Sequence, residues 1–399
     1  MSRRNKTMTH KELISCPSCL HKANLELLYQ IRNTPVHQNV IYDAFDGAIN
    51  CRRGELSLLY CHNCGIIFNS QFRSELLEYG EQYNNKQSVS EYFKSYLQDS
   101  VELLIQKYEI INKIIVDVGC GNGEFLELLS RKSHSKGIGF DPSYVGPSQT
   151  SNAHFISDYL TEKYSPLRAD VLIFRHVLEH IDKPNQFLST ILKYLHIDGD
   201  CKIIIEVPDF DWIVEQGSYW DIFYEHVNYF SKQSLRNLLE SIGLNVIDIF
   251  NQFNGQYMVA IASYEPCNIS KNDVNIKFST NCSMIEIFKR NIEKKNDEVG
   301  KIINQFEANS LFTIWGAAAK GVTFLNCLNS DIQKRIPFVI DINEAKHGKY
   351  CAGVGVKIMP PAILKQRMDV KNIIVMNPNY IQEIPVFLPK NNIFNLVSI

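Results

Sequence analysis

The chain has 399 residues, a formal net charge of −2 at pH 7 and a hydrophobic fraction of 45%. The length predicts two or three domains, because a single hydrophobic core rarely grows beyond about 250–300 residues. The near-neutral charge argues against nucleic acid or an anionic membrane surface as a partner. In addition, no apolar run approaches the ~20 residues of a membrane span.

Disulfides are not expected, although the chain contains eleven cysteines. Disulfide-dense chains are usually short and secreted. The residues after Met1 are polar and no apolar run follows them, so we see no signal peptide. We therefore expect a cytoplasmic protein with reduced thiols.

Two Cys-x-x-Cys pairs lie in the N-terminal part of the chain, Cys16 with Cys19 and Cys61 with Cys64. Each pair can present two thiolates to one ion, and two pairs complete a tetrahedral Cys₄ zinc site. Such a closed site is structural rather than catalytic. Residues 1–78 hold too little apolar material for a core of their own, so we predict a zinc-binding module. A chance pattern or a redox dithiol is the alternative.

The middle of the chain, residues 79–265, begins with a predicted helix whose apolar side includes Tyr92 and Ile105. Predicted strands and helices then alternate. This alternation is typical of a mainly parallel, doubly wound α/β sheet. The strands predicted are Ile114–Val118, Gly137–Phe140, Val171–Phe174, Ile203–Val207, Val246–Phe250 and Tyr257–Ala262.

A linker rich in Asn, Ser and Lys is expected from Pro266 to Asn281. A long amphipathic helix follows, with apolar residues from Ile285 to Phe306 on one side. A second strand, glycine turn and helix then begin at Phe312. Residues 266–399 are therefore predicted to form a separate, smaller Rossmann-like α/β domain, with later strands at Phe338–Ile340 and Asn372–Met376.

The first strand of the middle domain runs into a glycine turn, in which Gly119, Gly121 and Gly123 follow Asp117. Glycines let the backbone approach a ligand closely at the carboxyl end of the strand. The Gly-x-Gly-x-Gly spacing is tighter than the Gly-x-Gly-x-x-Gly turn that holds a pyrophosphate, and favours a ligand without phosphates. Asp141 ends the next strand, where a carboxylate can accept hydrogen bonds from ribose hydroxyls.

The run Val-Asp-Val-Gly-Cys-Gly-Asn-Gly resembles motif I of class I S-adenosylmethionine-dependent methyltransferases. The resemblance implies this cofactor, with Gly119 and Gly121 at its methionine end, Asp141 at the ribose and Asp158 facing the adenine. A glycine turn for another nucleotide and a solvated Asp158 are the alternatives. The cofactor-binding candidates are Asp117, Gly119, Gly121, Gly123, Asp141 and Asp158.

Two later segments carry candidate catalytic residues. His180 follows the predicted strand at Val171, and strand ends of an open parallel sheet are where substrates meet cofactors. Glu225 and His226 follow the next strand in an aromatic segment. Histidine suits proton abstraction because its pKa lies near neutrality, and such a base contributes about 10²–10⁴ in rate. A packing role is the alternative for both histidines.

Taken over its whole length, the chain resembles the deoxysugar C-methyltransferases, which methylate carbon on nucleotide-linked 4-keto-6-deoxysugars. That family combines a Cys₄ module, a class I methyltransferase core with a Glu-His-Val segment, and a Gly-Ala-x-x-Lys-Gly domain. The resemblance implies His226 as the base that removes the proton next to the ketone. The matching residues are His180, Glu225, His226, Gly316, Ala317, Lys320, Gly321, Asp341, Lys346 and Gly348.

Two family tyrosines are not matched. The loop before the core usually reads Tyr-x-Tyr-x-Ser, but Tyr83 is followed here by two asparagines. Phe223 stands where the family has a tyrosine before Glu-His, with Tyr224 adjacent. Such tyrosines are candidate acids or enolate stabilisers, so Tyr83 and Tyr224 stay candidates for substrate binding and catalysis.

Lys320 begins a predicted helix between Gly316 and Gly321. A helix N-terminus favours an anion, so a nucleotide diphosphate is the expected ligand of these residues. The spacing is not that of a Walker loop. The alternative is a glycine turn that only packs a helix against a sheet.

We therefore expect an α/β methyltransferase: a class I doubly wound sheet flanked by an N-terminal zinc-binding module and a C-terminal Rossmann-like domain. The predicted substrate is a small molecule, with no nucleic acid or membrane partner. Methylation of oxygen or nitrogen in a natural-product or polysaccharide intermediate is the main alternative. RNA methylation and a binding protein without chemistry are further alternatives, the former disfavoured by the charge.

Overall fold

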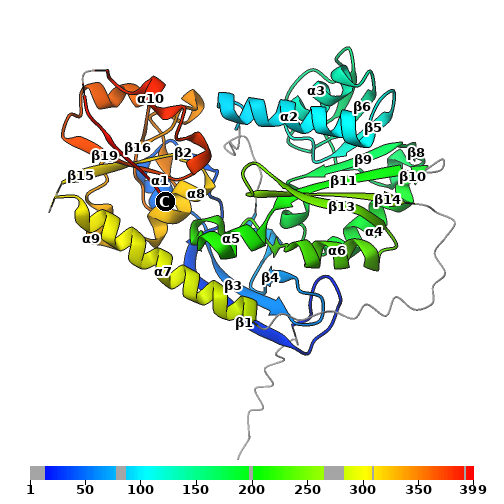
Figure 1. The fold of residues 1–399 in the computed structure, drawn as a ribbon, viewed down its shortest axis with the longest axis horizontal. Helices are drawn as coiled ribbons and strands as arrows, with labels where there is room; N and C mark the ends of the chain where they lie inside the picture. The colour runs from blue at the N-terminus through cyan, green and yellow to red at the C-terminus, as the bar shows by residue number, and fades with distance from the viewer. Residues whose placement is uncertain (1–13, 78–86, 197–200, 265–282, 308–309, 391) are drawn as a thin grey trace, which may run out of the picture.

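The computed structural model describes residues 14–399 except 78–86, 197–200, 265–282, 308–309 and 391. Figure 1 shows two lobes, with the N-terminal strands beneath them. Within the described part of the chain, no helix combines the length and the apolar character needed to cross a membrane.

The N-terminal strands form a four-stranded antiparallel sheet in the order β1-β3-β4-β12. Its last strand comes from the middle of the chain and so joins the module to the middle lobe. A short strand of the module, β2, pairs instead with β17 of the C-terminal lobe. The bounds are β1 Leu25–Pro35, β2 Ile41–Tyr42, α1 Phe45–Ile49, β3 Arg53–Cys61, β4 Ile67–Asn69, β12 Asn228–Tyr229 and β17 Tyr350–Cys351.

The middle lobe holds a seven-stranded sheet in the order β13-β14-β11-β9-β5-β6-β7. Only β14 is antiparallel to its neighbours, so the predicted doubly wound, mainly parallel sheet is confirmed. All six predicted strands are present. The four-residue strand β7 was not predicted, because its short apolar run includes an exposed histidine. The strands are β5 Ile114–Val118, β6 Lys136–Phe140, β7 Ala153–Ile156, β9 Val171–Arg175, β11 Cys201–Pro208, β13 Asn245–Gln252 and β14 Tyr257–Tyr264.

Helices cover both faces of this sheet (Figure 1). The predicted helix around Tyr92 is α2, and its N-cap Ser90 accepts a hydrogen bond from the Phe93 amide. The helices are α2 Glu91–Tyr108, α3 Glu124–Lys132, α4 Pro184–Tyr194, α5 Phe210–Gln216 and α6 Lys232–Ser241, and a small parallel pair joins β8 Leu167–Arg168 to β10 Leu195–His196.

The C-terminal lobe is a five-stranded parallel sheet in the order β18-β16-β15-β19-β20, which confirms the second predicted α/β unit. The predicted amphipathic helix is α7, and the predicted linker lies outside the described residues. The bounds are α7 Ser283–Gln305, β15 Leu311–Trp315, α8 Ala319–Cys327, α9 Ser330–Gln333, β16 Val339–Ile340, β18 Ile358–Met359, β19 Val370–Val375, α10 Ile384–Phe387 and β20 Asn395–Ser398.

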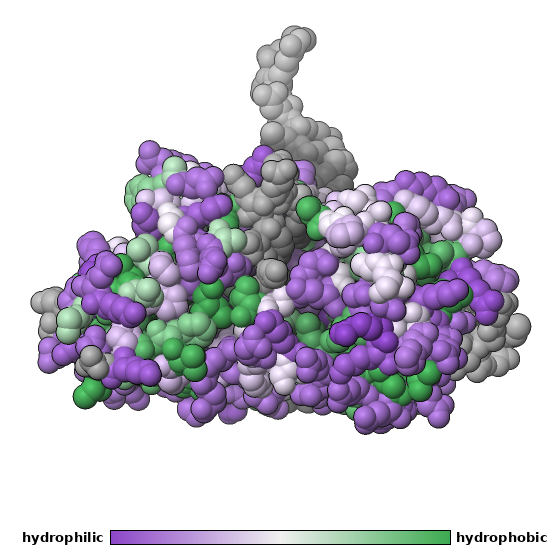
Figure 2. Space-filling model, turned by 90° about the horizontal axis from the view of Figure 1, so that it is seen from above, coloured by the Kyte–Doolittle hydropathy of each residue, from purple (hydrophilic) through white to green (hydrophobic). Residues whose placement is uncertain are grey.

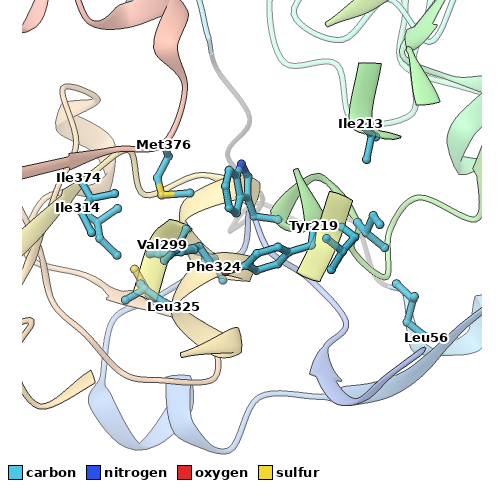
Figure 3. Packing of buried hydrophobic residues seen from close by; sticks show 14 of the residues in the cluster. Leu56, Ile213, Tyr219, Val299, Ile314, Phe324, Leu325, Ile374 and Met376 are labelled. Carbon is cyan, nitrogen blue, oxygen red and sulfur yellow. The ribbon is translucent and has the colours of Figure 1, made fainter. Parts of the chain in front are cut away.

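One hydrophobic cluster crosses all three predicted domains. It includes Leu56 of the module, Ile213 and Tyr219 of the middle lobe, and Phe324 of the C-terminal lobe. Figure 3 shows Tyr219 beside Phe324, with Val299 of α7 and Leu325 next to them. The domain boundaries at residues 78 and 265 stay predictions, but the core does not divide at them.

Candidate active site

The predicted cofactor turn lies at the carboxyl end of β5, in the centre of the seven-stranded sheet. Gly119, Gly121 and Gly123 have φ angles of +79°, +55° and +78°. This left-handed backbone favours glycine, because a Cβ would strain it. The Gly121 amide donates to Asp141 Oδ2 at 2.9 Å, which ties the turn to the end of β6.

The space beside the turn fits a bound cofactor. A Cβ built on Gly121 would meet no atom within 4 Å, whereas one on Gly119 would lie 2.5 Å from Val177 Cγ2. Asp117 is 2% exposed, and its Oδ1 has no hydrogen-bond partner among the described residues. A buried acceptor beside open space suits the charged amine of an amino-acid ligand.

Burial raises the pKa of Asp117 to about 7, although the nearby Arg175 opposes this shift. The two other predicted cofactor carboxylates already have local partners. Asp141 Oδ1 accepts from the Ser143 amide at 2.8 Å and from its hydroxyl at 2.6 Å. Asp158 accepts from the Tyr164 hydroxyl at 2.8 Å and pairs with Lys163.

A charged cluster lies at the end of β9, next to the cofactor turn. Arg175 makes two hydrogen bonds to Glu206, at 2.9 and 3.1 Å. His176 has a φ of +54° and lies between two carboxylates, with Nε2 at 2.9 Å from Glu206 and Nδ1 at 3.3 Å from Glu179. Burial alone would lower the pKa of His176, but Glu179 and Glu206 raise it to about 9.

Sequence reasoning did not select His176 or Glu179. It assigned the segment to the end of a strand but chose only His180. His176 could have been selected from its position immediately after a buried strand. What sequence could not give is the second carboxylate, Glu206, which lies on the neighbouring strand β11.

His180 and His226 face each other, although 45 residues separate their main chains. Their ring centroids are 5.0 Å apart with planes at 80°. His180 Nδ1 lies 2.9 Å from the carbonyl oxygen of Glu225, so this nitrogen carries the proton and Nε2 carries the lone pair. The His226 and Phe223 ring centroids are 4.0 Å apart with the planes tilted by 45°, and His226 Nδ1 is buried without a hydrogen-bond partner among the described residues.

The His226 side chain is neutral in this site. Burial lowers its pKa well below the ordinary value, and the positive charges of His176 and Lys320 add to the effect. A neutral imidazole keeps a lone pair that can accept a proton.

Glu225 and Tyr224, by contrast, point away from the cavity. Glu225 is fully buried against the N-terminal module, where its carboxylate contacts His37 Nδ1 at 3.2 Å and accepts from the Gln38 amide at 3.0 Å. The Tyr224 hydroxyl accepts from the Arg73 amide at 2.9 Å. Both side chains therefore hold the module against the catalytic lobe. Tyr83 lies outside the described residues.

A cavity of about 230 Å³ opens between the two lobes and is lined by both. Figure 2 shows hydrophobic side chains gathered along this boundary. The middle lobe contributes His176, Glu179, His180 and His226. Further lining residues are Asn39, Trp212, Asp221, Phe223, Gln256, Tyr257, Trp315, Gly316, Lys320, Asp341, Asn377 and Tyr380.

Lys320 spans the boundary between the lobes. Its Nζ lies 2.8 Å from Asp221 Oδ1 and 3.1 Å from Gln256 Oε1, over the ring of Trp212. Gly316 lines the cavity, whereas a Cβ on Gly321 would lie 1.9 Å from the Gly316 carbonyl oxygen. Gly321 is therefore required for close packing of α8 against the turn.

The four predicted cysteine ligands converge. Cys16 Sγ lies 3.5 Å from Cys64 Sγ, and Cys19 Sγ lies 3.6 Å from Cys61 Sγ. All four sulfurs are within 4.8 Å of one another, a group that could hold a metal ion. Disulfide sulfurs lie at about 2.05 Å. The separations instead approach the edge, roughly 3.8 Å, of a tetrahedron with zinc–sulfur bonds of about 2.3 Å.

Comparison with known proteins gives two family matches in chain order. Residues 89–249 match a methyltransferase domain, and residues 272–388 match a C-methyltransferase C-terminal domain. The first match covers the seven-stranded sheet through β13, and the second covers α7 and most of the C-terminal lobe.

Two characterised relatives align with parts of the chain. The C-methyltransferase NovU of Streptomyces niveus is 25% identical over 247 residues, which cover 59% of this chain and 56% of that protein. A tRNA U34 carboxymethyltransferase of Sulfurovum sp. (strain NBC37-1) is 31% identical over 112 residues, 26% of this chain and 37% of that protein. The chain thus spans about half or less of each relative's length.

Solved structures overlay on less than half of the chain. The 1,6-didemethyltoxoflavin-N1-methyltransferase of Burkholderia thailandensis is 15% identical, with a TM-score of 0.33 over 44% of this chain and 86% of that one. The plantazolicin methyltransferase BpumL, in complex with S-adenosylhomocysteine, is 17% identical, with a TM-score of 0.35 over 45% and 87%.

Proposed function

We propose that this chain, a class I S-adenosylmethionine-dependent methyltransferase that carries the C-terminal domain of the C-methyltransferase family, methylates carbon. The proposed substrate is a nucleotide-linked 4-keto-deoxysugar or a related small molecule. The observation that carries this proposal is the neutral His226, held beside His180 in a cavity between the two lobes.

His226 is the proposed base. A proton on carbon next to a ketone is weakly acidic, and a positioned histidine can remove it. His226 Nδ1 is buried without a hydrogen-bond partner among the described residues, and a neutral imidazole can take this proton. His180 Nε2 carries a second lone pair in the same cavity. The hydrogen bond from His180 Nδ1 to the Glu225 carbonyl fixes the orientation of this ring. Glu225 acts in this proposal by holding that backbone, and Tyr224 has no catalytic part.

S-adenosylmethionine supplies an electrophilic methyl group. The proposed contacts are Asp117 with the cofactor's amine, Gly119 and Gly121 with its methionine end, and Asp141 with its ribose. Asp117 offers a buried acceptor without a partner, and Gly121 adjoins open space. Gly119 contacts Val177, just before the segment with Glu179 and His180. Glu179 and His180, which line the cavity with His226, follow Val177 closely in the chain, and this supports a cofactor position next to the proposed base.

Lys320 is the proposed contact for an anionic part of the substrate, such as a nucleotide diphosphate. It lines the cavity, but its charge is balanced by Asp221 at 2.8 Å. An anion therefore has to compete with this carboxylate. Gly316 offers its backbone at the same wall.

The Cys₄ cluster is the proposed structural zinc site. A four-thiolate shell leaves no coordination position for a substrate. Its proposed part is to hold the module that contacts Glu225.

The test is solvent-deuterium exchange into a panel of nucleotide-linked 4-ketosugars, followed by NMR, with the wild-type protein and His226→Ala. Wild type should exchange the proton next to the ketone and then transfer methyl to that carbon. His226→Ala should lose both by about 10²–10⁴-fold. Lack of exchange into every ketosugar would contradict the enolate mechanism, and methyl transfer without exchange would favour methylation of oxygen or nitrogen.

A further inference from the structure

A second group of metal-binding side chains lies inside the cavity, separate from the cysteine cluster. Glu179 and His180 end the short 3₁₀ helix Leu178–His180, and His226 comes from the segment before β12. One carboxylate oxygen and one nitrogen of each ring lie within 4.8 Å of one another. All three residues line the cavity. The fold therefore brings two imidazoles and one carboxylate to the same point.

Glu179 and His180 each have one atom held by the protein and one atom without a protein partner. His180 Nδ1 donates to the Glu225 carbonyl, which leaves the lone pair of Nε2. Glu179 Oε1 contacts His176 Nδ1 at 3.3 Å, while Oε2 is buried without a hydrogen-bond partner among the described residues. Such outer contacts typically orient metal ligands and fix the tautomer of the histidines.

The leftover atoms need a common partner. Glu179 is 1% exposed, so water from the bulk does not reach its free oxygen. His226 Nδ1 is buried and unpartnered as well. Buried polar atoms are normally satisfied. A single cation bound between them would satisfy both. The cavity lysines already have partners: Lys320 contacts Asp221 and Gln256, and Lys346 contacts Asp341 and the Ala317 carbonyl.

The donor set selects the kind of ion. Two imidazoles and one carboxylate suit divalent first-row transition metals, and Mg²⁺ and Ca²⁺ prefer all-oxygen sites. Three protein ligands also leave coordination positions open toward the cavity, unlike the closed Cys₄ group.

We propose that Glu179, His180 and His226 bind a divalent first-row transition metal ion, and that its binding inhibits methyl transfer. The inhibitory part rests on the proposed function. A nitrogen bound to a metal has no lone pair for a proton, so the metal and the proton transfer by His226 exclude each other.

The test is a Co²⁺ titration of the full-length, zinc-loaded protein, followed by absorption spectroscopy and metal analysis. One further equivalent should bind, with ligand-field bands but without thiolate charge-transfer bands. Glu179→Gln and His226→Ala should each weaken this binding by more than about 10-fold. His154→Ala is the matched control, because His154 is an exposed histidine of β7, away from both proposed metal sites. Thermal melting establishes that each variant is folded.

Absence of a further equivalent, or binding that both variants leave unchanged, would overturn the metal site. These binding results do not need a known substrate, so they stand even if no ketosugar is methylated. Saturating Co²⁺ should lower kcat by about 10²-fold or more, the size of a general-base contribution, and a mild chelator that leaves the zinc content unchanged should restore it. If Co²⁺ raises kcat instead, the site stands, but the inhibition and the proposed role of His226 as the base are wrong.

Discussion

At the scale of one residue, the ionisation of Asp117, which precedes the cofactor turn, should make the stability of the protein depend on pH. Asp117 lies on β5, 2% exposed, and burial raises its pKa to about 7 from an ordinary value of 3.8. The folded state therefore holds a proton on Asp117 over a pH range in which the unfolded chain has lost it. Stability attributable to this group is greatest at low pH and falls as the pH rises from about 4 to about 7.

Asp117→Asn should remove this dependence. Relative to wild type, the variant should gain about 2–3 kcal/mol of unfolding free energy between pH 5 and pH 8, at about 1.4 kcal/mol for each pH unit within the shifted range. Denaturant unfolding at both pH values, without cofactor, measures the difference. Equal changes in wild type and variant would show that Asp117 does not titrate in this range.

Substitution by alanine should have different effects on stability at Gly119 and at Gly121. At Gly121 the added methyl group meets only open space, so the protein should fold and lose about 1 kcal/mol for a left-handed alanine. The methyl group nevertheless occupies the space proposed for the cofactor, so Kd for S-adenosylmethionine should rise at least about 10-fold. At Gly119 the methyl group meets Val177 at 2.5 Å, and stability should fall further.

Calorimetric titration with S-adenosylmethionine and denaturant unfolding of Gly121→Ala and Gly119→Ala check this pair. An unchanged Kd in Gly121→Ala would place the cofactor elsewhere.

Among the secondary-structure elements, β12 connects the site to the N-terminal module. It begins two residues after His226 and pairs with β4 of the N-terminal module. The module also holds Glu225 through the segment before β2. Disturbing the module should therefore move the proposed base, His226. The cofactor turn should stay in place, because it is held by β5 and by its hydrogen bond to Asp141 at the end of β6.

Cys64→Ser tests this connection. The variant should lose zinc and lower kcat by at least about 10-fold, with a much smaller change in Kd for S-adenosylmethionine, because a structural metal contributes directly to the stability of such a module. Metal analysis, calorimetry and methyl-transfer assays give the three quantities. Cys327→Ser is the control, since Cys327 is an exposed cysteine on the C-terminal lobe. A kcat equal to that of the control would separate the module from catalysis.

Sequence periodicity predicted these elements well where one face is buried. The six predicted strands of the seven-stranded sheet and the helices α2, α7 and α8 lie where the apolar pattern indicated, whereas the short strand β7 had no such pattern. The pairing of β12 with β4 could not be predicted, because a two-residue strand has no pattern of its own and exists only through its partner.

At the scale of the whole molecule, the cavity depends on how the lobes dock. Glu383 of the C-terminal lobe accepts from the Ser90 hydroxyl at 2.5 Å and from the Glu91 amide at 3.1 Å, at the N-terminus of α2. A carboxylate at a helix N-terminus is favourable for the helix dipole. This contact ties the two walls of the cavity together, in addition to the pair of Lys320 with Asp221.

Glu383→Ala should loosen the docking. Hydrogen bonds to charged groups contribute about 1.5–3 kcal/mol, so we expect KM for the substrate to rise about 10-fold, with an unchanged Kd for S-adenosylmethionine. Small-angle scattering should show a larger radius of gyration. Asp331→Ala, which removes an exposed partner of Lys334, is the control. An unchanged KM and radius would show that other contacts fix the lobes.

By itself, the sequence determined the α/β architecture, the cofactor turn and the four converging cysteines, because each depends on local spacing or on a repeated apolar pattern. It also identified His180 and His226 as candidate catalytic residues. Only the tertiary structure decided that these two rings face each other, that Glu225 points into the N-terminal module, and that Glu179 joins the histidines. The physical reason is that such contacts join residues tens to hundreds of positions apart, and chain spacing carries no information on which strand ends and loops meet.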